Sequence, residues 1–202
     1  DKKGESHTVV AARLRQAARS LIDMPNDRMV IVAIHEMTRT GAPMIALEII
    51  RHLKKHFNKD VLVLCLGPRG PLHKEFKEAS VLVAENLGQG LSTAAEDTQR
   101  FLSVLAERIP CRNVLVNSLC STELAVACRN AGFEVTSLVH EYPYAFDPDW
   151  IRRHFDHAQA VIFPCRDVYE CFVTNGTGIC APGKSGPNFS ILPQGCYQLE
   201  KE

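Results

Sequence analysis

A repeated alternation of short apolar runs with longer amphipathic segments constrains the fold more than any other feature of the sequence. The apolar runs consist mainly of Val, Ile, Leu, Ala and Met, which is typical of strands buried on both faces. Seven strands are expected, at 29–35, 61–66, 81–84, 114–116, 135–139, 160–163 and 190–192. Because strands alternate with helices, the pattern predicts an α/β fold with a Rossmann-like, doubly wound parallel sheet of about seven strands.

Helices are expected between these strands because apolar residues recur there three and four positions apart. The predicted helices lie at 43–56, 71–79, 94–108, 121–130, 149–156 and 166–172. Pro71 suits the first position of the second helix. Ser118 or Ser121 can cap the fourth helix, and Gly132 follows its end.

The domain organisation is predicted from length and from breaks in the pattern. A chain of 202 residues is long enough for one well-buried α/β core and short for two. We expect an N-terminal amphipathic helix and linker at 1–25, a Rossmann-like domain at 26–197, and the truncated start of an inter-domain connection at 198–202. The chain begins without Met and ends without an obvious closing element, so we expect it to be a piece of a longer protein.

Composition narrows the possible partners. Lys and Arg number 23, as do Asp and Glu, so no global electrostatic attraction points to nucleic acid or to an anionic membrane. No apolar run reaches the length of a bilayer span. The eight cysteines never form a C-x-x-C pair, which indicates reduced thiols in a cytoplasmic protein.

Ligands of doubly wound sheets bind beyond the carboxyl ends of the strands, so the loops there are the candidate sites. After the first strand, the small residues Gly41 and Ala42 at a helix N-terminus let backbone N–H groups approach an anion, which suggests a phosphate or sugar cradle. A tight strand-to-helix turn without a ligand explains the same spacing equally well. The G-x-G-x-x-G fingerprint of dinucleotide binding is missing.

The loop after the fifth strand brings together an imidazole, a carboxylate and two aromatic rings, in the sequence His140-Glu141-Tyr142-Pro143-Tyr144. Histidine can hydrogen-bond a sugar hydroxyl or act as a base, and the carboxylate can take a proton or orient the imidazole. The aromatic faces can pack on a pyranose ring. The alternative is a capping histidine beside a solvated glutamate.

Residues 178–185 match the G-x-x-x-x-G-K-[ST] pattern of a nucleotide-triphosphate loop. The match follows a turn-rich segment rather than a buried strand, and Pro187 opposes a continuing helix, so a flexible Gly/Pro loop is favoured.

Other reactive side chains are assigned to ordinary structural roles. His52 and His56 have no third ligand at suitable spacing and are taken as solvated helix residues. His154 and His157 are placed in a polar helix end, where a metal site is improbable. Cys165 and Cys171, which flank a short helix, are interpreted as inert thiols because no activating base is near them in sequence.

Several of these segments resemble the N-terminal domains of GT-B glycosyltransferases of the retaining, family-4-like kind that build bacterial polysaccharides. Residues 35–43 (HEMTRTGAP) are similar to the family's H-x-x-S-R-T-G-A-P loop and carry the most specific likeness. Weaker similarities to G-P-L-x-x-E-F, V-N-S, V-H-E and L-P-Q-G lie at 70–76, 116–118, 139–141 and 191–195. Thr38 and Cys165 depart from the serines common in the family at their positions.

The resemblance implies a site between this domain and a nucleotide-sugar-binding domain that the chain lacks. It implies that His140 and Glu141 are the catalytic residues, with His140 beside the transferred sugar. The implied donor- and acceptor-binding residues are Arg39, Thr40, Gly41, Ala42, Asn117 and Tyr142, with no metal. The partners would be a nucleotide-sugar donor and a glycan acceptor, without a cofactor, and membrane association would concern only the full-length protein.

The function expected from the resemblance is hexosyl transfer to a glycan or lipid-linked acceptor hydroxyl by the full-length protein, with the isolated domain inactive. Two alternatives stay open. One is a non-catalytic Rossmann-like interaction module of a polysaccharide-synthesis protein, and the other, less favoured, is a P-loop NTPase.

Overall fold

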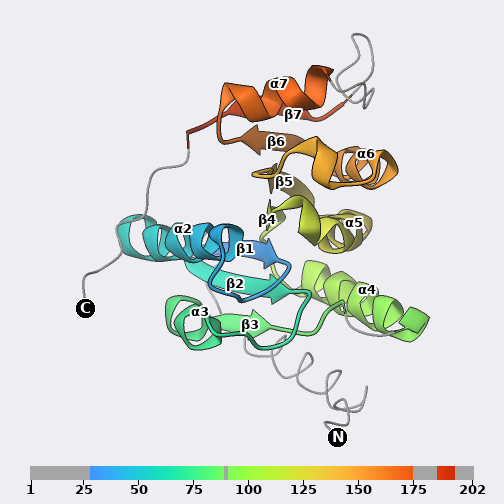
Figure 1. Ribbon diagram of the computed structural model, residues 1–202. Coiled ribbons are helices and arrows are strands. Elements are labelled where there is room, and N and C mark those ends of the chain that lie inside the picture. Colours follow the sequence, from blue (N-terminus) through green and yellow to red (C-terminus); the bar gives the residue numbers. More distant parts are fainter. Residues whose placement is uncertain (1–27, 89–90, 175–185, 194–202) are drawn as a thin grey trace, which may run out of the picture.

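The chain folds around one parallel sheet, as the computed structural model shows for residues 28–88, 91–174 and 186–193 (Figure 1). Seven strands lie in the order β3-β2-β1-β4-β5-β6-β7, and every neighbouring pair is parallel. Their bounds are β1 Met29–Ile34, β2 Asp60–Cys65, β3 Leu82–Ala84, β4 Asn113–Asn117, β5 Glu134–Leu138, β6 Ala160–Phe163 and β7 Asn188–Ile191. The predicted Rossmann-like, doubly wound α/β fold is confirmed.

Helices connect the successive strands and lie where the helical spacing predicts them. Their bounds are α2 Gly41–Phe57, α3 His73–Ala79, α4 Leu91–Arg108, α5 Thr122–Asn130, α6 Pro148–Asp156 and α7 Arg166–Thr174. Two short 3₁₀ turns, η1 at Leu119–Ser121 and η2 at Pro143–Ala145, follow β4 and β5 at the carboxyl edge of the sheet.

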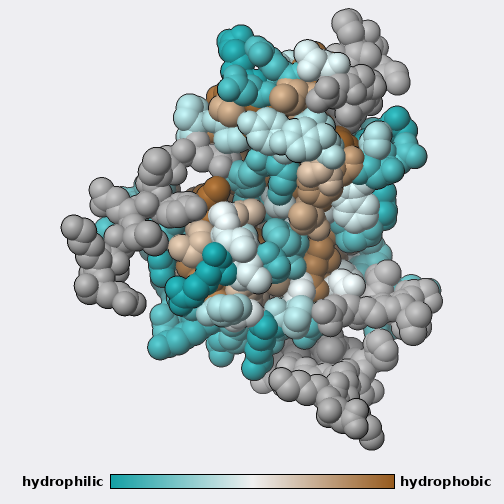
Figure 2. All heavy atoms as spheres, viewed as in Figure 1, coloured by the Kyte–Doolittle hydropathy of each residue, from teal (hydrophilic) through white to brown (hydrophobic). Residues whose placement is uncertain are grey.

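The sheet separates two hydrophobic cores. On one face, α2 and α3 pack through Leu47, Ile50 and Phe76 against alternate residues of β1 and β2. On the other face, helices α4 to α7 pack against the opposite side chains of the strands, with Phe155 and Phe163 among the buried residues. Figure 1 shows α2 and α3 on one side of the sheet and α4, α5 and α6 on the other. In Figure 2, hydrophilic side chains dominate the visible surface, with a narrow band of hydrophobic ones between them.

Two local predictions need correction. Helix α3 begins at His73, so Pro71 is not its first residue. Pro71 lies instead in a turn in which the His73 N–H donates to the Gly70 carbonyl at 3.0 Å. Ser118 caps the η1 turn rather than α5, because its hydroxyl accepts from the Cys120 N–H. Gly132 does follow α5, with a φ of 88° that favours glycine.

His154 is not in a solvated polar helix end, as its sequence neighbours suggest, but in the protein core. It shares a face of α6 with Ile151 and Phe155, three and one positions away, and is 0 % exposed. Its two ring nitrogens lie 2.9 Å from the Thr122 hydroxyl and 2.5 Å from the Ser137 hydroxyl. The hydroxyls of α5 and β5 therefore satisfy an imidazole that burial would otherwise leave unpaired.

Some expectations lie outside the described residues. These are the N-terminal amphipathic helix and linker at 1–25, the 178–185 segment, and the start of an inter-domain connection at 198–202. Among the described residues, no helix is both long and apolar enough to cross a bilayer. The six cysteines in this part of the chain are free thiols.

Candidate functional site

The strand order reverses between β1 and β4, and ligands of doubly wound sheets bind at such a switch point, beyond the carboxyl ends of the strands. The chain leaves β1 toward α2 on one face and leaves β4 toward α5 on the other. The β1 and β4 strands are hydrogen-bonded neighbours, with Ala33 paired to Val116. The residues just beyond these strands therefore meet at one place, although they are far apart in sequence.

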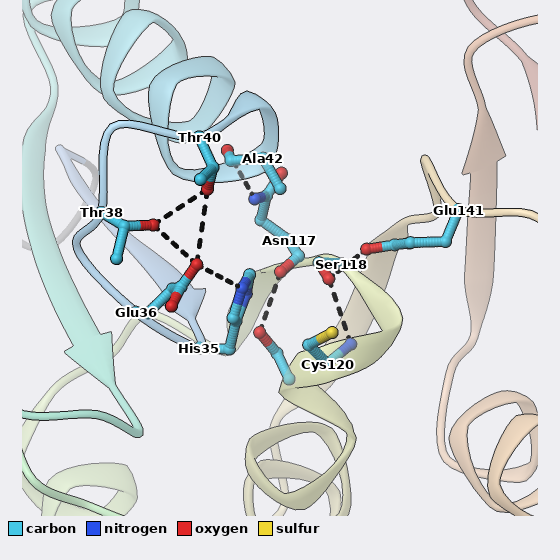
Figure 3. Close-up of polar contacts among 10 residues, drawn as sticks. His35, Glu36, Thr38, Thr40, Ala42, Asn117, Ser118, Cys120 and Glu141 are labelled. Carbon is cyan, nitrogen blue, oxygen red and sulfur yellow. Dashed lines mark hydrogen bonds and ion pairs between the residues drawn. The ribbon is translucent and has the colours of Figure 1, made fainter. Parts of the chain in front are cut away.

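In the loop between β1 and α2, polar side chains form a network around the Glu36 carboxylate (Figure 3). The Thr38 hydroxyl donates to Glu36 Oε1 at 2.6 Å, and the Thr40 hydroxyl donates to the same oxygen at 3.4 Å. His35 Nε2 lies 3.3 Å from that oxygen. The carboxylate thus holds the loop that leads into the first turn of α2.

The N-terminus of α2 is open. Its N-cap residue, Thr40, makes no side-chain capping bond, and the first turn contains no acidic residue. A Cβ atom built on Gly41 would meet nothing within 4 Å. The first N–H groups of a helix have no intrahelical partner and carry the positive end of the helix dipole. The geometry therefore leaves space and partial positive charge for an anion at Gly41 and Ala42.

Asn117, the last residue of β4, joins the loops that follow β1 and β5. Its Nδ2 donates to the Ala42 carbonyl at 2.9 Å, and its Oδ1 lies 2.8 Å from His140 Nε2. The side chain is 1 % exposed. The structure therefore brings Asn117, Ala42 and His140 together.

The Glu141 carboxylate accepts hydrogen bonds from three groups around it. Oε1 accepts from the Ser118 hydroxyl (Figure 3). Oε2 accepts from the N–H groups of Leu119 at 3.3 Å and His140 at 3.1 Å. Glu141 is therefore an acceptor that secures the loops after β4 and β5.

Ser118 adopts an unusual backbone conformation at the centre of this network. Its φ of 84° and ψ of 145° lie in a region that non-glycine residues rarely occupy. Besides its contact with Glu141, the Ser118 hydroxyl accepts from the Cys120 N–H at 3.1 Å. These bonds hold a strained residue directly beside Asn117.

The remaining predicted site residues lie toward the margins. The exposed Arg39 guanidinium pairs with Glu75 of α3 at 2.9 Å. Tyr142 is 38 % exposed and stacks on Tyr144, with 5.4 Å between the ring centroids. The two rings form an aromatic surface next to His140 and Glu141 in sequence.

Three polar residues of this region were not among the residues predicted from sequence: His35, Glu36 and Ser118. Nδ1 of His35 is buried and has no hydrogen-bond partner within the part of the chain that the structure describes. His35 and Glu36 follow the first strand directly, a position that could have drawn attention to them. No sequence pattern indicates the backbone conformation of Ser118.

One thiol lies next to the network, and the described residues contain no cluster of metal-binding side chains. Cys120 lies beside Ser118, and burial raises the pKa of its thiol, which favours the protonated form. Within residues 28–88, 91–174 and 186–193, no group of three or more His, Cys, Asp or Glu side chains is arranged to hold a metal ion.

The fold is a Rossmann-like, doubly wound parallel sheet with a polar network at its switch point. At the level of sequence, the chain matches no protein-family model and no curated protein. A solved structure of HepE from Anabaena, in complex with UDP and glucose, superposes with a TM-score of 0.60 at 14% identity. The match covers 84% of this chain and 45% of HepE.

A second similar structure is UGT2 of Phytolacca americana, in complex with UDP-2-fluoro-glucose and pterostilbene. It gives a TM-score of 0.48 at 11% identity, over 83% of this chain and 53% of UGT2. The chain thus spans about half the length of either structure.

Proposed function

We propose that this chain is the N-terminal, acceptor-side domain of a glycosyltransferase that moves a hexose from a nucleotide-sugar donor to a hydroxyl of a glycan or lipid-linked acceptor. One observation carries the proposal. At the switch point, the Asn117 side chain connects the imidazole of His140 with the open N-terminus of α2. Likeness of fold to HepE, whose structure contains UDP and glucose, supports the same kind of donor.

In the proposed complex, the N-terminus of α2 faces the donor diphosphate. Backbone N–H groups at Gly41 and Ala42 and the helix dipole would stabilise the negative charge that develops on the leaving diphosphate. Thr40, whose hydroxyl lies 2.9 Å from that of Thr38, would add a polar contact at the same place. We propose that this arrangement works without a metal ion or a cofactor.

His140 is proposed to contact the transferred sugar. Its half-buried ring lies at the carboxyl edge of the sheet, where an imidazole can hydrogen-bond a sugar hydroxyl. Glu141 is proposed to assist it, and the contacts of its carboxylate with Ser118, Leu119 and the His140 N–H favour an orienting role. Tyr142, on the exposed side of this loop, would pack against the acceptor.

Transfer requires a second domain. A half-cleft cannot hold donor and acceptor together, so we expect negligible activity from this domain alone. The complete protein is proposed to be cytoplasmic, to take part in polysaccharide synthesis, and to grip the nucleotide with a second α/β domain. Arg39, at the margin of the site, would then meet substrate only if its pair with Glu75 opens.

The test is a transferase assay on the full-length natural protein with a panel of nucleotide sugars. We expect transfer of one sugar, and a loss of about 100-fold or more in kcat/KM for His140→Ala. Gly41→Val should weaken donor binding, because its side chain enters the space where the anion would lie. Arg129→Gln, a change at an exposed residue of α5, is the control and should leave kinetics unchanged.

If the natural protein neither transfers a sugar nor binds any nucleotide sugar, the proposal is wrong. The interaction-module hypothesis then replaces it.

A further inference from the structure

The Asn117 side chain lies between the Ala42 carbonyl and the His140 ring. The carbonyl can only accept a hydrogen bond, whereas the neutral ring can carry its hydrogen on either nitrogen. The Ala42 carbonyl oxygen, 2.9 Å away, has no hydrogen to donate, so the amide must present its NH₂ group there. The amide oxygen must then face His140 Nε2, at 2.8 Å. An amide oxygen can only accept, and therefore His140 Nε2 must carry a hydrogen.

We infer that Asn117 is a positioning residue that fixes the protonation site of His140 and ties its ring to the first turn of α2. With Nε2 always protonated, the basic nitrogen of the neutral ring is Nδ1. The inference rests on the proposed function only where it concerns the role of His140 in catalysis. The contacts of Asn117 do not depend on a substrate.

The surroundings of Asn117 hold its amide in place. The residue is 1 % exposed, and its own carbonyl accepts from the Ser121 hydroxyl at 2.8 Å. The next residue, Ser118, donates its N–H to Leu138 of β5 at 2.8 Å, and its hydroxyl donates to Glu141. An amide with so little freedom can transmit the position of α2 to the imidazole.

The link also makes the two halves of the site interdependent. Ala42 lies 75 positions from Asn117 in sequence, and His140 lies 23 positions beyond it. A displacement of the first turn of α2 would move the amide and, through it, the imidazole. Binding of an anion at α2 and the orientation of His140 are therefore expected to influence each other.

Two substitutions separate the two contacts. Asn117→Asp keeps an oxygen facing His140 but places a second acceptor against the Ala42 carbonyl, so it breaks only the contact with α2. Asn117→Leu has a similar volume and removes both contacts. Asn113 lies at the exposed, opposite end of β4, so Asn113→Asp and Asn113→Leu are matched controls with the same changes on the same strand.

The decisive measurement is nuclear magnetic resonance of the histidine rings in the ¹⁵N-labelled 202-residue chain, with His140 assigned from His140→Gln. In the unmodified chain we expect a slowly exchanging Nε2–H signal with a nuclear Overhauser contact to the Asn117 side chain. Asn117→Leu should abolish that signal. Asn117→Asp should keep it and raise the midpoint of His140 protonation by about one pH unit, because a carboxylate stabilises the charged ring.

Glu141, whose carboxylate accepts from the backbone N–H of His140, is unchanged in all four variants. Hydrogen exchange at the first turn of α2 should accelerate in both Asn117 variants and in neither Asn113 variant. If Asn117→Leu does not fold, the Asn117→Asp signals and exchange rates decide the question alone.

A neutral His140 with its hydrogen on Nδ1 overturns the inference. So does a protected Nε2–H signal in a folded Asn117→Leu variant. These measurements need no substrate, so they can fail while sugar transfer by the natural protein succeeds, and the reverse is also possible. The transferase assay then reports on the proposed function, and the ring signals report on Asn117.

Discussion

His154 Nε2 lies 2.5 Å from the Ser137 hydroxyl in the core beneath α6, where the imidazole is fully buried. Burial, with a smaller contribution from His157, lowers the pKa of His154 to about 3. The pKa of histidine in an unfolded chain is about 6.5. Between these values the unfolded chain binds a proton that the folded chain does not, so stability is lost as the pH falls below 6.5.

The first prediction is therefore acid sensitivity that originates at His154. One proton per chain corresponds to about 1.4 kcal/mol per pH unit, so the free energy of unfolding should fall by about 2 kcal/mol between pH 7 and pH 5 from this group. His154→Gln should remove that part of the pH dependence. Urea denaturation of the unmodified chain and of His154→Gln at pH 7 and pH 5 measures this difference. If the free energy of unfolding falls equally in both between the two pH values, His154 is not the source.

The second prediction contrasts two glycines. Gly41→Ala should leave the free energy of unfolding unchanged or raise it by up to about 1 kcal/mol, because its Cβ meets no atom within 4 Å and alanine favours a helix. Gly70→Ala should lower it by about 1–3 kcal/mol, because its Cβ would lie 2.4 Å from the Met37 carbonyl oxygen. Thermal and urea denaturation compare the two, and a Gly70→Ala variant as stable as Gly41→Ala would contradict the packing of this loop.

The third prediction concerns the strained backbone of Ser118. Ser118→Ala and Ser118→Gly both lose the hydrogen bonds to Glu141 and Cys120, but only glycine adopts a φ of 84° without a steric penalty. The glycine variant should therefore be more stable than the alanine variant by roughly 1 kcal/mol. Equilibrium denaturation tests the order of the two. Greater stability of the alanine variant would mean that φ at this position is not positive.

The fourth prediction is the order in which thiols react. Burial raises the pKa of both Cys65 and Cys128 to about 12, so these thiols should stay unmodified by a maleimide at pH 7.5 until the chain unfolds. Cys165 is exposed and should react within the folded protein. Mass spectrometry of peptides from timed labelling measures each site. Simultaneous labelling of Cys65 and Cys165 in native conditions would show that the core opens.

The strands could be predicted because their sequences satisfy two independent conditions. A run such as 61–66 is apolar throughout, which only burial on both faces explains, and turn residues bound it. The predicted strand 114–116 was one residue too short at each end because Asn113 and Asn117 are polar, although both belong to β4. Asn113 is polar because it is exposed to solvent at the amino edge, and Asn117 is polar because it bonds to Ala42 and His140 at the carboxyl edge.

The contacts within the site could be predicted only in part. The loops after β1 and β5 were identified from their residue types, and both lie at the carboxyl edge. The bond from Asn117 to Ala42 joins residues 75 positions apart and depends on the strand order, which no local pattern encodes. His154 was misplaced because its polar neighbours masked its position on the buried face of α6.

In a doubly wound parallel sheet, the residues that bind ligands lie at the carboxyl edge, so a label can be attached at the amino edge without touching them. Asn113 and Glu134 are exposed and pair in register at the amino edge, where β4 and β5 begin. Asn113 lies one strand length, about 13 Å, from Asn117. A dye or a solid support coupled to the thiol of an Asn113→Cys variant would therefore report on this domain, or immobilise it, from the edge opposite Asn117 and His140.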